Sequence, residues 1–291
     1  MPTSTYAHVA VVASFLERTR PESVLDVGVG NGKMGFIVRD LLDVMLGGRH
    51  RSEDWLVRLD GIEAFGEYVQ AHQRAIYNEI HLGDAVDLID RLGSYDVIIL
   101  GDVLEHFERG RAEAFFERCF AHARAIILNI PLGERWTQDA IYGNPHERHL
   151  SFWKWEDFAP FACRLEAFEF ETLGSYGCFL IERVDYLHHR ARQDSDALAG
   201  AGRIEEALSG LEQALQRLGR VLATELQIAE FLVQQGDFGL AARRLGESTI
   251  LFPDAAASLA PQVEQLNGLA LADDRQLRAA GPGGQLDLSQ S

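Results

Sequence analysis

The sequence predicts an α/β domain with a mainly parallel sheet, followed by a smaller all-α module. Three observations lead to this fold class. Short β-rich runs alternate with helical patterns from Ser23 to about Val184, which is typical of βα units. The last two strand candidates follow each other with no helix between them, which indicates an antiparallel hairpin at the sheet edge. After Val184 the composition changes to Ala, Leu, Gln, Glu and Arg, and the pattern is helical throughout.

Each strand candidate is a short run rich in apolar and β-branched residues. GSYG (174–177) separates the last two and predicts the turn of the hairpin. The carboxyl ends of parallel strands share one edge of a sheet, which is where we expect a ligand. In chain order the strand candidates are residues 24–29, 56–64, 80–84, 95–103, 125–131, 164–173 and 178–184.

The composition predicts three parts along the chain. We expect the α/β domain at residues 1–186, the helical module at 187–271 and a disordered tail at 272–291.

An internal repeat is the main feature of the helical module. Residues 201–215 align with residues 235–249 at a spacing of 34, pairing Ala207 with Ala241. This period resembles tetratricopeptide repeats, and two unrelated amphipathic helix pairs are the alternative. Because two repeats bury little surface alone, we expect the module to dock on the first domain, on a second copy in a homodimer, or on a partner protein.

The overall composition narrows the class of partner. The 44 acidic and 27 basic residues give a formal net charge of −17, which disfavours nucleic acid. No run of about 18 apolar residues occurs, so we expect no membrane span. The N-terminus has no Lys or Arg before its short apolar run, so we expect no exported leader. The three cysteines are widely spaced and odd in number, which fits a reducing cytoplasm rather than a disulfide framework.

VLDVGVGNGK (24–33) is an apolar strand that runs into three glycines and then into a helical pattern. Such a turn lets a ligand approach the backbone and the helix N-terminus. A phosphate-binding P-loop is excluded because Val27 and Met34 stand where it needs Gly and Ser or Thr. A dinucleotide fingerprint is weakened because Lys33 stands where its last glycine belongs, so an NAD-dependent enzyme stays a minor alternative.

The third class of ligand is S-adenosylmethionine. The run from Val24 to Gly32 resembles the first motif of class I methyltransferases, an acid followed by GxGxG. YDVIILGDVLEHF (95–107) resembles the pattern that the family shows at its fourth strand. The resemblance implies a Rossmann-like, seven-stranded methyltransferase sheet, mostly parallel with a C-terminal antiparallel hairpin. It covers about residues 5–184.

The resemblance also implies roles for the acids that end the second and third strands. Glu63 stands where the family binds the ribose hydroxyls, and Asp84 where it accepts from the adenine amine. A solvated loop acid at Glu63 and a helix cap at Asp84 are the alternatives. The residues expected to bind the cofactor are Asp26, Gly28, Gly30, Asn31, Gly32, Glu63, Ala64, Asp84, Ala85, Gly101, Asp102 and Val103.

The acceptor side is expected after the fourth and fifth strands. His106 either faces the acceptor or begins the next helix. The long segment 131–158 suits an acceptor pocket or lid, and its GNPHERHLSFW stretch contains His146 and His149. We expect no metal, because H-x-x-H lacks the helical i,i+4 spacing of a zinc motif. His149 is either a general base oriented by Glu147 or another acid, or a structural residue that orders the loop.

The predicted function is methyl transfer from S-adenosylmethionine to a small-molecule acceptor at oxygen, such as a sugar or a biosynthetic intermediate. Two alternatives stay open. A protein methyltransferase would recruit its target through the helical repeats, and a non-catalytic interaction protein would retain only the cofactor fold.

Overall fold

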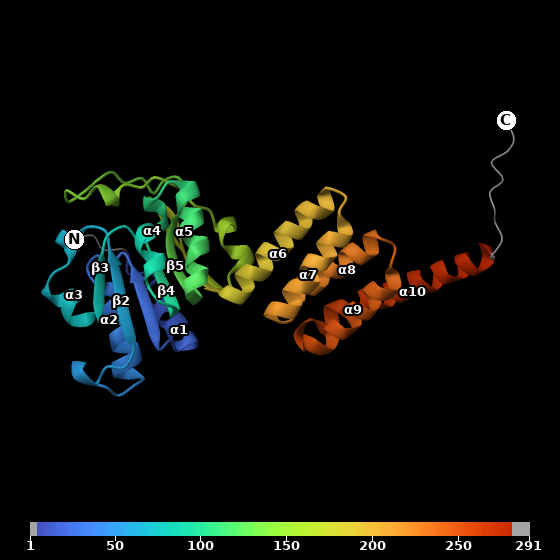
Figure 1. Ribbon diagram of the computed structural model, residues 1–291, viewed down its shortest axis with the longest axis horizontal. Coiled ribbons are helices and arrows are strands. Elements are labelled where there is room, and N and C mark those ends of the chain that lie inside the picture. Colours follow the sequence, from blue (N-terminus) through green and yellow to red (C-terminus); the bar gives the residue numbers. More distant parts are fainter. Residues whose placement is uncertain (1–4, 281–291) are drawn as a thin grey trace. The chain divides into compact units, whose positions relative to one another are not determined.

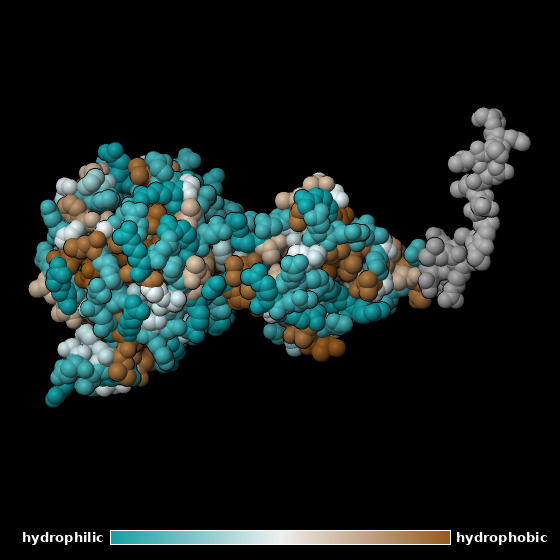
Figure 2. Space-filling model, viewed as in Figure 1, coloured by the Kyte–Doolittle hydropathy of each residue, from teal (hydrophilic) through white to brown (hydrophobic). Residues whose placement is uncertain are grey.

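We describe the protein from a computed structural model of residues 5–280, with side chains described to Asp273. The chain divides into two compact units between Tyr186 and Leu187. The division falls inside helix α6 (Arg183–Gly200). Figure 2 shows that both units expose mainly hydrophilic residues in this view, in keeping with the net charge of −17.

The first unit is built on a seven-stranded sheet in the order β3-β2-β1-β4-β5-β7-β6 (Figure 1). The first five strands are parallel, and β7 is antiparallel to both its neighbours. All seven predicted strands are present. They are β1 (Ser23–Val27), β2 (Arg58–Glu63), β3 (Glu79–Leu82), β4 (Tyr95–Gly101), β5 (Ala123–Leu132), β6 (Arg164–Phe170) and β7 (Gly174–Glu182).

Helices cover the sheet on both faces (Figure 1). The central strands β4 and β5 are mostly apolar, in keeping with the burial of both of their faces. Residues of α1 and α2 form one core with inward residues of the central strands, and α5 packs on β5. The helices of this unit are α1 (Val9–Thr19), α2 (Lys33–Val38), α3 (Ala71–Ile76), α4 (Ala85–Leu88) and α5 (Arg109–His122).

The predicted edge hairpin is confirmed, but its turn lies elsewhere. The turn comprises residues 171–173, and GSYG forms the start of β7, with Tyr176 paired to Pro131 of β5. Gly177 is a packing requirement rather than a turn residue, because a Cβ there would lie 2.5 Å from the ring of Phe179. Gly174, with φ +98°, closes the turn, whereas Gly177 was misleading as a turn residue.

The second unit is helical within its described residues. Four helices follow α6: α7 (Ile204–Leu218), α8 (Leu222–Gln234), α9 (Phe238–Leu251) and α10 (Ala256–Ala280). Each contacts the next along the chain. Because α10 continues to Ala280, the tail expected from residue 272 is wrong for residues 272–280, and residues 281–291 lie outside the described part.

Residues 34 positions apart occupy equivalent places in the two helix pairs. Ala207 and Ala241 are both fully buried, at 0% exposure. Gly202 and Gly236 both have positive φ, +78° and +83°, two positions before the first residues of α7 and α9. This correspondence is a structural basis for the sequence repeat, whereas the resemblance to tetratricopeptide repeats stays a prediction.

Candidate active site

A cavity of about 320 Å³ lies at the carboxyl edge of the parallel strands. At this edge β1 has β2 on one side and β4 on the other, which is the switch point where open α/β sheets bind ligands. Every site residue predicted from the sequence lines this cavity except Gly32. Residues that the prediction missed also line it, among them Thr5, Lys33, Tyr68, Glu105, Trp136, Gln138, Asn144 and Tyr176.

The glycine turn uses left-handed backbone at three positions. Gly28, Gly30 and Gly32 have φ of +79°, +48° and +78°. A Cβ on Gly28 would also lie 3.1 Å from Val103. Gly32 is the residue before α2, so its role is to turn the chain into that helix rather than to contact a ligand.

Glu63 is buried at the end of β2, with 5% exposure, and lines the cavity. One carboxylate oxygen accepts from the backbone N–H of Gly30 at 2.9 Å, and the other from that of Phe65 at 2.8 Å. Burial raises its pKa, although these two amides oppose the shift. A carboxylate has about four acceptor positions, so Glu63 fixes the turn and still has acceptor capacity for a ligand. It is not a solvated loop acid.

Asp26 lies beneath the glycine turn and is almost fully buried. Burial raises its pKa to about 7, although the Tyr77 hydroxyl donates to its carboxyl and opposes the shift. The backbone N–H of Gly35 donates to the same hydroxyl at 3.1 Å. Tyr77 therefore connects β1 with α2. Sequence analysis missed it because its partners are far away along the chain.

Asp84 is a helix cap that also lines the cavity. One of its oxygens accepts from the backbone N–H of Val86 at 2.9 Å and caps α4, while the other binds Arg111 at 2.7 Å. Asp84 and Ala85 also line the cavity. The helix cap is thus present, and the carboxylate stays next to the ligand space.

Asp102 follows β4 with a left-handed backbone, at φ +53°. Tyr176 of β7 donates its hydroxyl to the Asp102 carboxylate at 2.8 Å. Left-handed backbone at a non-glycine residue is strained and is often found at functional sites. Tyr176 is a second residue that sequence analysis missed, because it lies on the strand that was expected to begin after it.

The segment at residues 133–153 follows β5 and lies against the segment after β4. The backbone N–H groups of Leu150 and Ser151 both donate to the carbonyl of Glu105, at 2.7 and 3.1 Å. Glu147 accepts from Asn144 at 3.2 Å and from Gln138 at 3.3 Å. The sequence analysis considered Glu147 as the acid that orients His149, but a different group orients His149.

Two of the histidines that line the cavity, His106 and His149, are oriented by backbone carbonyls. Nδ1 of His149 lies 2.6 Å from the carbonyl oxygen of Trp136, and Nδ1 of His106 lies 3.2 Å from that of Arg148. A carbonyl only accepts, so Nδ1 carries the proton in each ring and Nε2 keeps its lone pair when the ring is neutral. Burial lowers the pKa of His106 to about 4 and also lowers that of His149.

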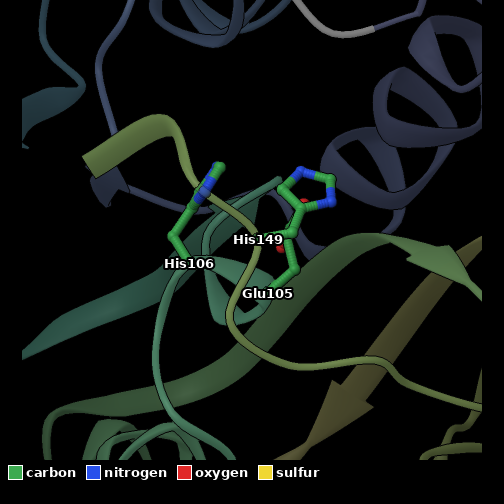
Figure 3. Close-up of side chains that lie close together, drawn as sticks. All are labelled: Glu105, His106 and His149. Carbon is green, nitrogen blue, oxygen red and sulfur yellow. The ribbon is translucent and has the colours of Figure 1, made fainter. Parts of the chain in front are cut away.

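Glu105 brings a buried acid to the same place. Its side chain is 1% exposed, and neither carboxylate oxygen has a hydrogen-bond partner among the described residues. Burial and the neighbouring Asp102 raise its pKa well above the usual range. One ligand-type atom each of Glu105, His106 and His149 lies within 4.8 Å of the other two (Figure 3). The sequence analysis did not group these three residues.

No protein-family model matches this chain, and no curated protein matches it. The solved N-terminal domain of EvdMO1, in the presence of SAH and D-fucose, is 16% identical, with a TM-score of 0.42 over 62% of this chain and 84% of that chain.

Two further solved structures are methyltransferases. The methyltransferase domain of bacterial CtHen1-CN is 16% identical, with a TM-score of 0.37 over 60% of this chain and 97% of that one. A SAM-dependent methyltransferase from Archaeoglobus fulgidus is 12% identical, with a TM-score of 0.40 over 60% and 94%. At such low TM-scores, none of these likenesses assigns an activity or a ligand to this chain.

Among the described residues, no helix is long and apolar enough to span a membrane.

Proposed function

We propose that this chain is a methyltransferase that takes S-adenosylmethionine as cofactor and transfers its methyl group to an oxygen of a small molecule. The observation that carries the proposal is the position of Glu63. It is a buried acceptor at the end of β2, beside a left-handed glycine turn, in a cavity at the switch point of the sheet. A ribose offers two hydroxyl donors to such a carboxylate.

Other residues of the cavity divide between the two ends of the cofactor. Asp84 and Ala85, after β3, are assigned to the adenine end. Gly101, Asp102 and Val103, after β4, are assigned to the methionine end. Both groups line the same cavity as Glu63, which supports one continuous binding site for an extended cofactor.

The acceptor is assigned to the part of the cavity walled by Glu105, His106 and His149. In the reaction an acceptor oxygen attacks the methyl carbon of the sulfonium. The new O–C bond forms as the S–CH3 bond breaks, the electron pair of that bond stays on sulfur, and the hydroxyl proton leaves to a base or to solvent. Alignment of the reactants accounts for much of such a rate enhancement. This wall is polar, which supports a hydroxyl acceptor such as that of a sugar.

Titration calorimetry with the full chain tests the proposal. We expect S-adenosylmethionine and S-adenosylhomocysteine to bind at a ratio of one per chain, and NAD to bind much more weakly. Incubation with S-adenosylmethionine and hydroxylated small molecules should release S-adenosylhomocysteine. No binding of either sulfur ligand at millimolar concentration would refute the proposed function, and tight binding of NAD alone would favour an oxidoreductase.

A protein acceptor recruited by the second unit is the alternative. The observation in its favour is the exposed apolar end of α9, where Ile250 is 79% and Leu251 is 47% exposed. If it holds, the double substitution of Ile250 and Leu251 by Ser abolishes methylation of a protein target without changing cofactor affinity.

A further inference from the structure

Glu105, His106 and His149 come together from two separate segments of the chain. Glu105 and His106 lie in the short turn after β4, and His149 lies in the long segment after β5. Figure 3 shows the three side chains gathered at one point. One ligand-type atom of each lies within 4.8 Å of the other two, and all three residues line the cavity.

The environment of Glu105 lacks a partner for a negative charge. Its side chain is 1% exposed, and no described group donates a hydrogen bond to either oxygen. Leaving a buried carboxylate without a partner costs several kcal/mol, so buried charges in proteins are generally paired or bound to a metal. The side chains beside it here are two imidazoles, which are themselves metal ligands.

The carbonyls behind the histidines fit this role. A metal-bound histidine almost always donates its other ring N–H to a carbonyl or carboxylate, which fixes the ring and its tautomer. The carbonyls of Trp136 and Arg148 accept from Nδ1 of His149 and His106, respectively. Nε2 of each ring is then the atom with a free lone pair.

We propose that Glu105, His106 and His149 bind one divalent transition-metal ion in the wall of the cavity. Ligand atoms at about 2.0–2.1 Å from such an ion lie about 3–3.5 Å from one another. Side-chain rotations that move each ligand atom by about an ångström bring the three atoms to this spacing. Two imidazoles with one carboxylate favour Zn²⁺, Mn²⁺, Fe²⁺ or Co²⁺ over Mg²⁺, which prefers oxygen ligands.

Three protein ligands leave coordination positions open toward the cavity. The ion can there bind a hydroxyl oxygen of the acceptor and lower the pKa of that hydroxyl, so that the proton leaves to solvent before or during attack. This step rests on the proposed methyl transfer, whereas metal binding by the three residues does not. An ion bound in this way would favour acceptors that offer oxygen ligands, such as the vicinal diols of sugars.

The sequence analysis expected no metal because it paired His149 with His146. His146 is exposed and is not a member of the three-residue group. It therefore supplies a matched control, since it is a histidine of the same segment that also lines the cavity.

The test uses the full chain after removal of metals with a chelator. Zn²⁺, Mn²⁺ and Mg²⁺ are titrated calorimetrically into the wild type and into the Glu105→Gln, His149→Ala and His146→Ala variants. We expect one Zn²⁺ or Mn²⁺ per chain, with affinity reduced at least about tenfold in the first two variants and unchanged in His146→Ala. Thermal unfolding verifies the fold, and if Glu105→Gln does not fold, His149→Ala decides.

Two results would overturn the site. One is no binding of Zn²⁺ or Mn²⁺ to the wild type at about 1 mM, and the other is binding to folded Glu105→Gln and His149→Ala that is as tight as to the wild type. S-adenosylhomocysteine is titrated into the same preparations. Metal binding without binding of this ligand would keep the metal site and refute the proposed methyl transfer. Ligand binding without metal binding would refute only the metal site and leave His149 as a metal-free base.

Discussion

At the scale of single residues, several polar groups of the cavity are held by a partner from another element. Glu63 of β2 accepts from Gly30 of the glycine turn, and Tyr176 of β7 donates to Asp102 after β4. Such contacts fix the side chains before a ligand arrives, which lowers the entropic cost of binding. Glu105 differs, because its carboxyl oxygens have no protein partner among the described residues.

Replacing Glu63 by Ala tests its assignment to the ribose. The change removes one or two hydrogen bonds to the ligand, each worth about 1.5 kcal/mol, and frees the N–H of Gly30. We expect the affinity for S-adenosylhomocysteine to fall about tenfold or more, as measured by calorimetry. Glu67→Ala is the control, because Glu67 is exposed and does not line the cavity. Equal affinities in the two variants would show that Glu63 does not bind the cofactor.

The buried Asp26 predicts a pH dependence of stability. Its carboxyl pKa is raised from 3.8 to about 7 by burial. Below about pH 4 both the folded and the unfolded chain are protonated at this group. Between about pH 4 and pH 7 the folded protein keeps a proton that the unfolded chain releases, so stability falls as pH rises, by about 4 kcal/mol in total.

Asp26→Asn isolates this contribution, since its amide oxygen can still accept from Tyr77. We expect the free energy of unfolding of the variant to gain on that of the wild type as pH rises from about 4 to 7, as measured by urea denaturation. Parallel pH profiles of the two proteins would contradict the raised pKa.

At the scale of elements, Tyr77 joins three pieces of the first unit. It follows α3, donates to Asp26 of β1 and accepts from Gly35 of α2. This close packing requires glycine at position 35, because a Cβ there would lie 2.3 Å from Cζ of Tyr77. Tyr77 and Glu63 therefore both hold the turn between β1 and α2 in place.

Gly35→Ala should displace Tyr77 and break both of its hydrogen bonds. Overpacking of this kind costs about 1–3 kcal/mol of unfolding free energy, measurable by urea denaturation. Gly110→Ala in α5 is the matched control, as a Cβ there meets nothing within 4 Å. It should be neutral or stabilise by up to about 1 kcal/mol. If Gly35→Ala were as stable as its control, the packing described around Tyr77 would be incorrect.

Particular elements show how far the sequence was informative. All seven strands were predictable, and all predicted site residues but Gly32 line the cavity, because buried strands are apolar runs and polar residues at their carboxyl ends meet at one edge. Tyr77 and Tyr176 were not, since their acidic partners lie 51 and 74 positions away. The motif after the fourth strand includes Glu105. Its burial beside His149 was not predictable, because it depends on the path of the segment after β5.

At the scale of the whole molecule, the two units have separate cores. The second unit contains its own ion-pair network, in which Glu225, with a fully buried side chain, binds both Arg220 and Arg244. Arg244 also binds Glu212. A ligand of the first unit stabilises only the part of the chain whose folding forms its site.

Arg244→Ala therefore tests the independence of the units. Loss of its charged hydrogen bonds should lower the stability of the second unit by about 1–3 kcal/mol in thermal unfolding, while the affinity for S-adenosylhomocysteine stays the same. Arg243→Ala, at an exposed neighbouring position, is the control. A marked loss of ligand affinity in Arg244→Ala would mean that the helical unit takes part in cofactor binding.

The most direct test of the proposed methyltransferase function is a crystal structure of the full chain with S-adenosylhomocysteine. We predict that both ribose hydroxyls lie within hydrogen-bond distance of Glu63, with the adenine beside Asp84 and the sulfur directed toward Glu105, His106 and His149. A ligand bound outside this cavity, or bound within it with its ribose away from Glu63, would contradict the account.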